Sequence, residues 1–118
     1  MPRESPDRDP AILLDIFVAA TRVRQFVAGV DALAFQDDLK TQSAVLHQLL
    51  VIGEATKRLS HEFRALHPSI PWTQMSGMRD HLIHGYDDVD LSEVWSTATV
   101  DIPKLLAAIE PLVPRPPA

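Results

Sequence analysis

Five residues that can move protons or bind phosphate fall within nine positions of the sequence, "MRDHLIHGY". They are Arg79, Asp80, His81, His84 and Tyr86. Asp80 and His84 are four positions apart, so on a helix the carboxylate can accept a hydrogen bond from one imidazole nitrogen and leave the other free. Arginine can bind a phosphate through two hydrogen bonds and stabilise the negative charge of a transition state. Histidine can give or take a proton near neutral pH.

This set of residues suits phosphate chemistry that needs no metal ion. RNA carries its own nucleophile, the 2′-hydroxyl, so a protein has only to hold the backbone, move a proton and neutralise the phosphorane. Three interpretations are open from the residues alone. The stretch could be catalytic, it could bind a ligand, or it could be an ordinary helix end at which arginine and histidine meet the negative end of the helix dipole.

A metal site is a further alternative. His81 and His84 form an H-x-x-H pair, a spacing at which two imidazoles on one helix can ligate a metal ion. Such a site needs more ligands, and only Asp87 and Asp88 stand nearby in the sequence. We therefore expect neither a metal ion nor another cofactor.

The elements that must position this stretch are predicted to be helices, because apolar residues recur at spacings of three and four and nowhere alternate as in a strand. A first helix is expected after Asp9 as its N-cap, with Pro10 in its first turn and Gly29 as its stop. Its apolar stripe is Ile12, Ile16, Ala19 or Ala20, Val23 and Val27.

A second long helix is predicted from Asp38 to Leu59, and Ser60 is expected to start a short one that ends before Pro68. The long helix contains Gly53, and a small residue inside a helix usually lets another helix approach closely. The side expected to be buried carries Leu39, Leu46, Leu49, Leu50, Gly53 and Thr56.

The motif is expected on a third helix, opened by Pro71 and running from about Trp72 to Tyr86. Its buried stripe is Met75, Met78 and Leu82. A last helix is predicted over residues 91–109. Asp90 and Glu93 have capping-box spacing at its start, and Pro103 predicts a kink in its interior.

These elements predict an all-α antiparallel bundle of four to five helices. We expect a flexible N-terminus over residues 1–8, a single helical domain over residues 9–112 and a proline-rich tail over residues 113–118. The 118 residues include no cysteine, which excludes disulfides, thiolate catalysis and a cysteine zinc site. No apolar run could span a bilayer, and the polar N-terminus does not resemble a signal peptide, so we expect a cytoplasmic protein.

The net charge of −5 weighs against a generic nucleic-acid binder, because such proteins are usually basic. Contact with nucleic acid would need a local positive cleft. Four of the arginines outside the motif are expected on solvated helix faces rather than along an RNA track; they are Arg22, Arg24, Arg58 and Arg64. Trp72 and Trp95 are expected to anchor the core or a dimer interface rather than to stack on bases. Glu54 could be buried beside Arg79 or a motif histidine, or could lie on the surface.

The motif resembles that of the HepT-like toxins in the HEPN superfamily of ribonucleases. Their pattern has an arginine, four residues, a histidine, one residue and a tyrosine, and here Arg79, His84 and Tyr86 occupy these positions. Asp80 stands where the family commonly has a polar residue. Other stretches also look like this family, and the resemblance covers roughly residues 10 to 110: "VIGEATKRLS" (51–60), "HPSIPW" (67–72), "GMRDHLIHGYDDVDLSEVW" (77–95) and "DIPKLLAAI" (101–109).

The resemblance implies a HEPN-like homodimer in which two motif helices face each other across a cleft. Two copies of Arg79 and His84 would then form a composite, metal-independent ribonuclease site that leaves 2′,3′-cyclic phosphate ends. Arg79 would stabilise the transition state and His84 would be the general acid or base. Asp80 would orient His84, and His81 and Glu54 are candidate supporting residues.

The resemblance also implies a partner, a nucleotidyltransferase antitoxin that can transfer AMP to the motif tyrosine, Tyr86. The pair would be a type II-like toxin–antitoxin system. Two alternatives belong to other classes of function. One is a non-catalytic helical binding subunit of a nucleotidyltransferase complex, which the acidic net charge favours, and the other is a plain helical interaction module.

Overall fold

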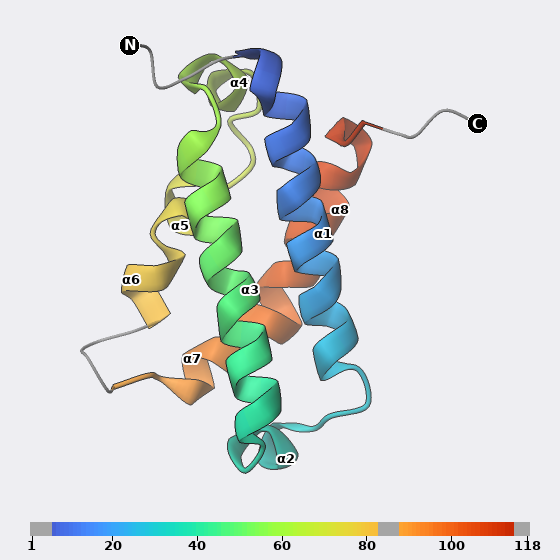
Figure 1. Ribbon diagram of the computed structural model, residues 1–118, viewed down its shortest axis with the longest axis vertical. Helices are drawn as coiled ribbons and strands as arrows, with labels where there is room; N and C mark the ends of the chain where they lie inside the picture. Colours follow the sequence, from blue (N-terminus) through green and yellow to red (C-terminus); the bar gives the residue numbers. More distant parts are fainter. Residues whose placement is uncertain (1–5, 83–87, 115–118) are drawn as a thin grey trace.

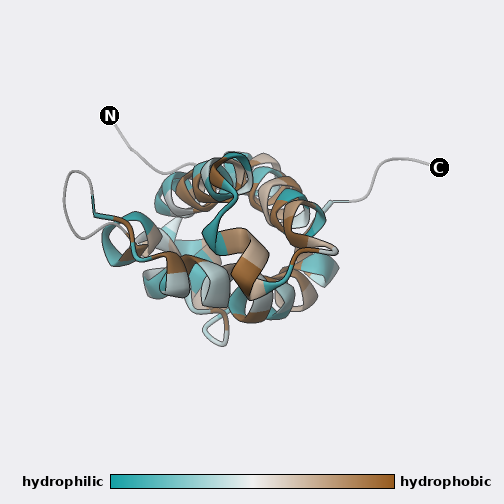
Figure 2. Ribbon diagram, turned by 90° about the horizontal axis from the view of Figure 1, so that it is seen from below, coloured by the Kyte–Doolittle hydropathy of each residue, from teal (hydrophilic) through white to brown (hydrophobic). Residues whose placement is uncertain are grey.

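The chain folds into two layers of helices. The computed structural model describes residues 6–82 and 88–114, which form helices and no β-strand. The long helices α1 (Asp9–Val27) and α3 (Leu39–Arg58) run side by side in opposite directions (Figure 1). Seen from below, this pair forms one layer and the later helices form the other (Figure 2). The remaining helices are α2 (Ala32–Gln36), α4 (His61–Leu66), α5 (Trp72–Ser76), α6 (Met78–Leu82), α7 (Leu91–Ser96) and α8 (Ile102–Ile109).

The hydrophobic core lies between the two layers. It contains the predicted stripe of α1, in which only Val27 is not fully buried. Burying an aliphatic side chain of this size stabilises the fold by about 1.5–3 kcal/mol. Leu39 was expected in the core, but it is 77% exposed because it begins α3 at one end of the molecule. Prominent core residues are Leu13, Ile16, Val23, Val45, Leu49, Ile52, Ile102 and Ile109.

Several helix ends follow the sequence prediction. The carboxylate of Asp38 accepts a hydrogen bond from the backbone N–H of Thr41 at 3.0 Å and caps α3. The hydroxyl of Ser60 accepts from the N–H of Phe63 at 3.0 Å and caps α4. Gly29, with a φ of +76°, follows α1 in the left-handed conformation that glycine adopts without strain.

The predicted role of Asp9 is wrong. Asp9 is the first residue of α1 and does not cap it, because a 3-10 turn, η1 (Pro6–Arg8), precedes the helix. Its carboxylate is buried and accepts hydrogen bonds from the backbone N–H of Ser60 at 2.9 Å and from the Ser60 hydroxyl at 2.6 Å. Asp9 therefore ties the start of α1 to the end of α3, 51 residues away in the sequence.

Two predicted helices are divided in the structure. The expected motif helix over residues 72–86 divides at Gly77 into α5 and α6. In the last helix, a π-helical segment, η2 (Thr97–Asp101), separates α7 from α8, where a simple kink was expected. Pro103 has no N–H to continue the hydrogen-bond ladder, and the wider π turn absorbs the interruption. The last helical segment among the described residues is a 3-10 turn, η3 (Glu110–Leu112).

Among the described helices, none has the combination of length and apolar sequence that crossing a bilayer requires.

Candidate functional site

The helix that carries the start of the motif is held against α3 by its apolar side. Met78 is 6% exposed and Leu82 is fully buried, as the spacing predicts. Met75, in the preceding helix, is buried in the same stripe. Since these positions face inward, the intervening residues of α6 face the solvent.

Gly53 allows this contact. A Cβ atom at Gly53 would lie 3.3 Å from the carbonyl oxygen of Met75 and 3.6 Å from that of Ser76. The junction between α5 and α6 therefore rests directly on the backbone of α3, and the predicted close approach at this glycine is confirmed. The position of Arg79 follows from this contact, because Arg79 is in the first turn of α6.

The junction itself is short and well bonded. The N–H of Gly77 donates to the carbonyl of Thr73 at 3.0 Å, and the N–H of His81 donates to the carbonyl of Gly77 at 2.9 Å. Trp72 anchors the start of α5, because its indole N–H donates to the carbonyls of Arg64 and His67 at 3.1 and 2.9 Å. Helix α6 is thus fixed at its N-terminal end and along its buried side.

Arg79 and Asp80 project from α6 into solvent, with side chains 62% and 82% exposed. The guanidinium Nη1 and the carboxylate Oδ1 are 3.9 Å apart, which is a loose ion pair. An exposed pair of this kind contributes little to stability, so its opening would leave Arg79 able to contact an incoming anion at small cost.

His81 connects α6 to α7. Its Nε2 atom lies 3.3 Å from Oε2 of Glu93. Asp90 caps α7 by accepting from the N–H of Glu93 at 3.1 Å, which confirms half of the predicted capping box. The N–H of Asp90 donates to the carbonyl of Leu82 at 3.2 Å, so the Glu93 side chain pairs with His81 instead. These bonds hold the end of α6 beside the start of α7.

The remaining motif residues, His84, Gly85 and Tyr86, lie outside the described residues, as does Asp87. The expected Asp80–His84 contact and the roles of His84 and Tyr86 stay predictions. Within residues 6–82 and 88–114, no cluster of three metal-ligating side chains occurs.

Glu54 is a surface residue, which is the second of the two placements that the sequence left open, and within the chain it does not pair with Arg79. Its side chain is 68% exposed and lies 3.6 Å from the ammonium of Lys57. Each residue turns an α-helix by about 100°, so a residue directly after the inward-facing Gly53 faces outward.

The tryptophans act as core residues of the single chain. Trp72 is 7% exposed, and Trp95 is partly buried with its ring 5.0 Å from that of Phe35. Among the arginines outside the motif, Arg64 is half-buried, whereas Arg22, Arg24 and Arg58 are exposed. Exposure does not distinguish a solvated helix face from an RNA track, so the expectation that these arginines lie on solvated faces stays a prediction.

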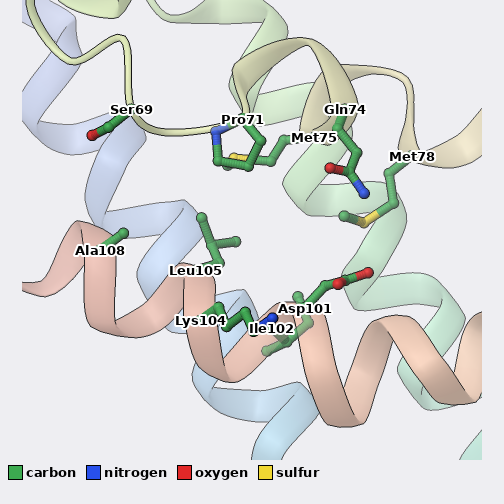
Figure 3. Close-up of a pocket in the computed structure, with 10 residues that line it drawn as sticks. All are labelled: Ser69, Pro71, Gln74, Met75, Met78, Asp101, Ile102, Lys104, Leu105 and Ala108. Carbon is green, nitrogen blue, oxygen red and sulfur yellow. The ribbon is translucent and has the colours of Figure 1, made fainter.

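A cavity of about 290 Å³ lies behind the motif helix, between α5 and α8 (Figure 3). Its described lining is mainly apolar and includes Met75, Met78 and Leu105, together with the polar residues Ser69, Gln74, Asp101 and Lys104. Arg79, Asp80 and His81 do not line it. The described polar residues of the motif, Arg79, Asp80 and His81, therefore face solvent on the outer surface of α6 and not this cavity.

The burial of two polar side chains was not predicted from the sequence. Asp9 has the partner described above, and Gln48 is 8% exposed with its Oε1 atom buried and unpartnered among the described residues. The signal for Gln48 was present, because it lies between Val45, Leu49 and Ile52 on the buried stripe of α3.

Comparison with known proteins shows which family this chain is similar to. Residues 16–112 match the family model described as "Ribonuclease HepT-like". A Thermococcus cleftensis protein named "Probable ribonuclease HepT" is 43% identical over 100 residues, which cover 85% of this chain and 91% of the relative. A Methanocaldococcus jannaschii protein named as a "Putative RNase" is 37% identical over 109 residues, or 92% of this chain and 94% of the relative. No solved structure gives a significant match.

Proposed function

Because the chain belongs to the HepT-like ribonuclease family, we propose that it is a metal-independent endoribonuclease. The observation that carries this proposal is the placement of Arg79. This cation is exposed on a short helix whose buried side rests on α3 at Gly53, so the helix backbone is fixed while the guanidinium is accessible. A fixed, accessible cation suits binding of the charge that develops during phosphodiester cleavage.

In the proposed reaction the RNA supplies the nucleophile. A general base removes the proton of the 2′-hydroxyl, the 2′-oxygen attacks phosphorus, and the bond to the 5′-oxygen breaks. A general acid protonates the 5′-oxygen, so the products are a 2′,3′-cyclic phosphate and a 5′-hydroxyl. We assign proton transfer to His84, charge stabilisation to Arg79 and orientation of His84 to Asp80.

We further propose that the site is composite and forms across a homodimer. Two copies of Arg79 would then converge on one phosphate, which would create a local positive field on a chain whose net charge is −5. The family resemblance supports this arrangement, since its members pair their motif helices across a cleft.

The proposed regulator is a nucleotidyltransferase antitoxin that adenylylates Tyr86. An AMP group at the mouth of the cleft would exclude RNA by its size and by its negative charge. A cytoplasmic location suits both the RNA and this partner.

The direct test is single-turnover cleavage of a labelled RNA pool in EDTA. Wild type should cleave and leave cyclic phosphate ends. His84→Ala should lose roughly 100- to 10,000-fold in rate, and Arg79→Ala should also be strongly impaired. Arg24→Ala is the matched control, because it removes an exposed arginine from α1 and leaves the motif intact. Intact RNA with wild type, or equal cleavage by all four proteins, would overturn the proposal.

Mixed dimers test the composite site. Equal amounts of Arg79→Ala and His84→Ala chains, allowed to exchange subunits, should form dimers with one arginine and one histidine on opposite protomers. Cleavage above that of either variant alone is expected if both protomers contribute to one site. No gain after demonstrated exchange would indicate separate sites.

The acidic net charge favours a second candidate, a non-catalytic binding subunit of the nucleotidyltransferase complex. That function predicts adenylylation of Tyr86 by the partner, read by mass spectrometry, without RNA cleavage by the unmodified chain.

A further inference from the structure

A groove runs along the outer face of the long helix pair, on the side of α3 turned away from the motif helix. It contains a hollow of about 320 Å³ lined by Leu14, Val18 and Arg22 of α1 and by His47, Gln48 and Val51 of α3. A neighbouring hollow of about 380 Å³ continues along α1 past Ala11 and shares Asp15 and Arg58 with the first. We call this surface the α1–α3 groove.

The groove is separate from the candidate cleavage site. Gly53 faces the junction of α5 and α6, and Val51, two positions earlier, points about 160° away around the helix axis. The groove can therefore bind a partner whether or not the chain cleaves RNA.

The centre of the groove is aliphatic and open. Leu14 and Val18 are 41% and 38% exposed, and they are four positions apart, so they form one apolar strip on α1. Val51 lies across the hollow on α3 and is half-buried. An apolar centre with a charged rim is the usual anatomy of a protein–protein interface.

The rim is basic, which is unusual on an acidic chain. Arg22 and His47 are exposed at one end and have no ion-pair or hydrogen-bond partner among the described residues. Arg8 and Arg58 line the other end. Asp15 lies 3.8 Å from Nη2 of Arg58 and is the only carboxylate among the described lining residues. The groove thus has spare positive charge at both ends.

Gln48 adds an unmet hydrogen bond. Its side chain lines the hollow, yet its Oε1 atom is buried and accepts no hydrogen bond from a described residue. A buried amide without a partner is costly, and a donor that enters the hollow would remove this cost once the amide turns toward it.

We propose that the α1–α3 groove docks an acidic amphipathic helix of a second protein. Its aliphatic side chains would cover Leu14, Val18 and Val51, and its carboxylates would pair with the arginines at both ends. A groove between two packed helices accepts a third helix through anchors spaced i, i+4 and i+7. From Ala11 to Arg22 the groove extends about 16 Å along α1, which equals three helical turns.

Two other occupants fit less well. Single-stranded RNA would meet the basic rim, but it binds best where aromatic side chains offer successive stacking surfaces, and the described lining residues include no phenylalanine, tyrosine or tryptophan. A second copy of this chain would place one basic rim against another, and like charges brought together across an interface are unfavourable.

The test uses the full chain and a fluorescent, helix-stabilised peptide of about 15 residues as the probe. The peptide is alanine-based, with leucines at i, i+4 and i+7, a serine beside them and glutamates near both ends. A matched peptide has lysine in place of each glutamate. Binding is followed by fluorescence anisotropy, and the docking surface is mapped by hydrogen exchange of amides in α1 and α3.

We expect the glutamate peptide to bind and the lysine peptide to bind far more weakly. Val18→Asp should weaken binding by about tenfold or more, because the aspartate would be buried against leucine. Arg22→Glu should weaken binding of the glutamate peptide and strengthen binding of the lysine peptide, a reversal that a merely structural role would not produce. Val18→Ser replaces Val18→Asp if circular dichroism shows that the latter does not fold.

Two matched controls carry the same chemical changes outside the groove. Arg24→Glu reverses an exposed arginine on α1, and Val100→Asp alters a valine that is 47% exposed on η2. Neither should change binding. The proposal is overturned if the glutamate peptide does not bind, if the lysine peptide binds equally well, or if protection lies outside α1 and α3. It is also overturned if Arg22→Glu instead abolishes binding of an RNA oligomer, or if Val18→Asp dissociates a dimer of this chain.

Discussion

Replacement of Gly53 by alanine tests how α3 positions the motif helix. Alanine favours the helical conformation of α3 by about 1 kcal/mol relative to glycine. Its Cβ would stand 3.3 Å from the Met75 carbonyl oxygen, which is tighter than an ordinary contact, and 3.6 Å from that of Ser76. Overpacking of this kind costs about 1–3 kcal/mol, so we expect a net destabilisation of about 0–2 kcal/mol.

The larger effect of Gly53→Ala should be on cleavage. The junction of α5 and α6 must retreat by a few tenths of an ångström, and Arg79 moves with it. Because a displacement of 1 Å can cost about 100-fold in rate, we expect a loss of roughly several-fold. Urea unfolding gives the stability, and single-turnover RNA cleavage gives the rate. Ser43→Ala is the control, since it raises helix propensity at an exposed position of α3.

Gly53→Val extends the series, because a β-branched side chain would push the junction further and should reduce both stability and rate more strongly. Gly53→Ala could instead be more stable than wild type by the full helix-propensity gain of about 1 kcal/mol and cleave RNA at the wild-type rate. That result would mean that α5 and α6 do not pack against the backbone of α3.

Three further changes probe buried or capping contacts. Asp9→Ala should destabilise the chain by about 2–4 kcal/mol in urea unfolding, because the N–H and hydroxyl of Ser60 lose a buried acceptor. A decrease of less than about 0.5 kcal/mol in the free energy of unfolding would contradict the presence of these two buried hydrogen bonds. Gln48→Met should stabilise the chain by about 1 kcal/mol, since it removes an unpartnered buried oxygen, and a lower melting temperature would show that the amide has a partner. The hydrogen bond from the Thr41 hydroxyl lowers the pKa of Asp38 below its ordinary value, so Thr41→Val should raise that pKa in an NMR titration. A depressed carboxyl pKa stabilises the fold at pH values above the unfolded pKa of about 4, and this stabilisation is lost as the pH falls through the folded pKa. Wild type and Thr41→Val should therefore converge in stability at acid pH. A stability difference that stays constant down to pH 2, well below the ordinary carboxyl pKa of about 4, would exclude this linkage.

The sequence predicted best where the physics is local. Ser60 and Asp38 cap helices with N–H groups three positions ahead, and Gly29 adopts a positive φ next to a helix end. The close approach at Gly53 was also predictable, because a glycine inside a strong helical pattern is costly unless something uses the space.

Two of the failures have the same physical cause, which is contact with a distant part of the chain. Asp9 has the sequence context of an N-cap, yet its partner is 51 residues away. The apolar spacing of Met75, Met78 and Leu82 predicted one helix through Gly77, whereas the packing of α5 and α6 against α3 divides the helix at this residue. The candidate site was thus predicted by residue type, and only the positions of Arg79, Asp80 and His81 could be compared with the structure.

The π-helical segment η2 fixes the rotational phase between two helices. Each residue of an α-helix advances the chain by about 100°, and a π turn accommodates one residue more than an α turn. If the same residues formed an unbroken α-helix in place of the π turn, α8 would be turned by about 100° relative to α7. Leu105 and Ile109 would then leave the core, and exposed residues such as Lys104 would take their place. Surface loops generally tolerate changes of length, whereas the number of residues between α7 and α8 is set by the core.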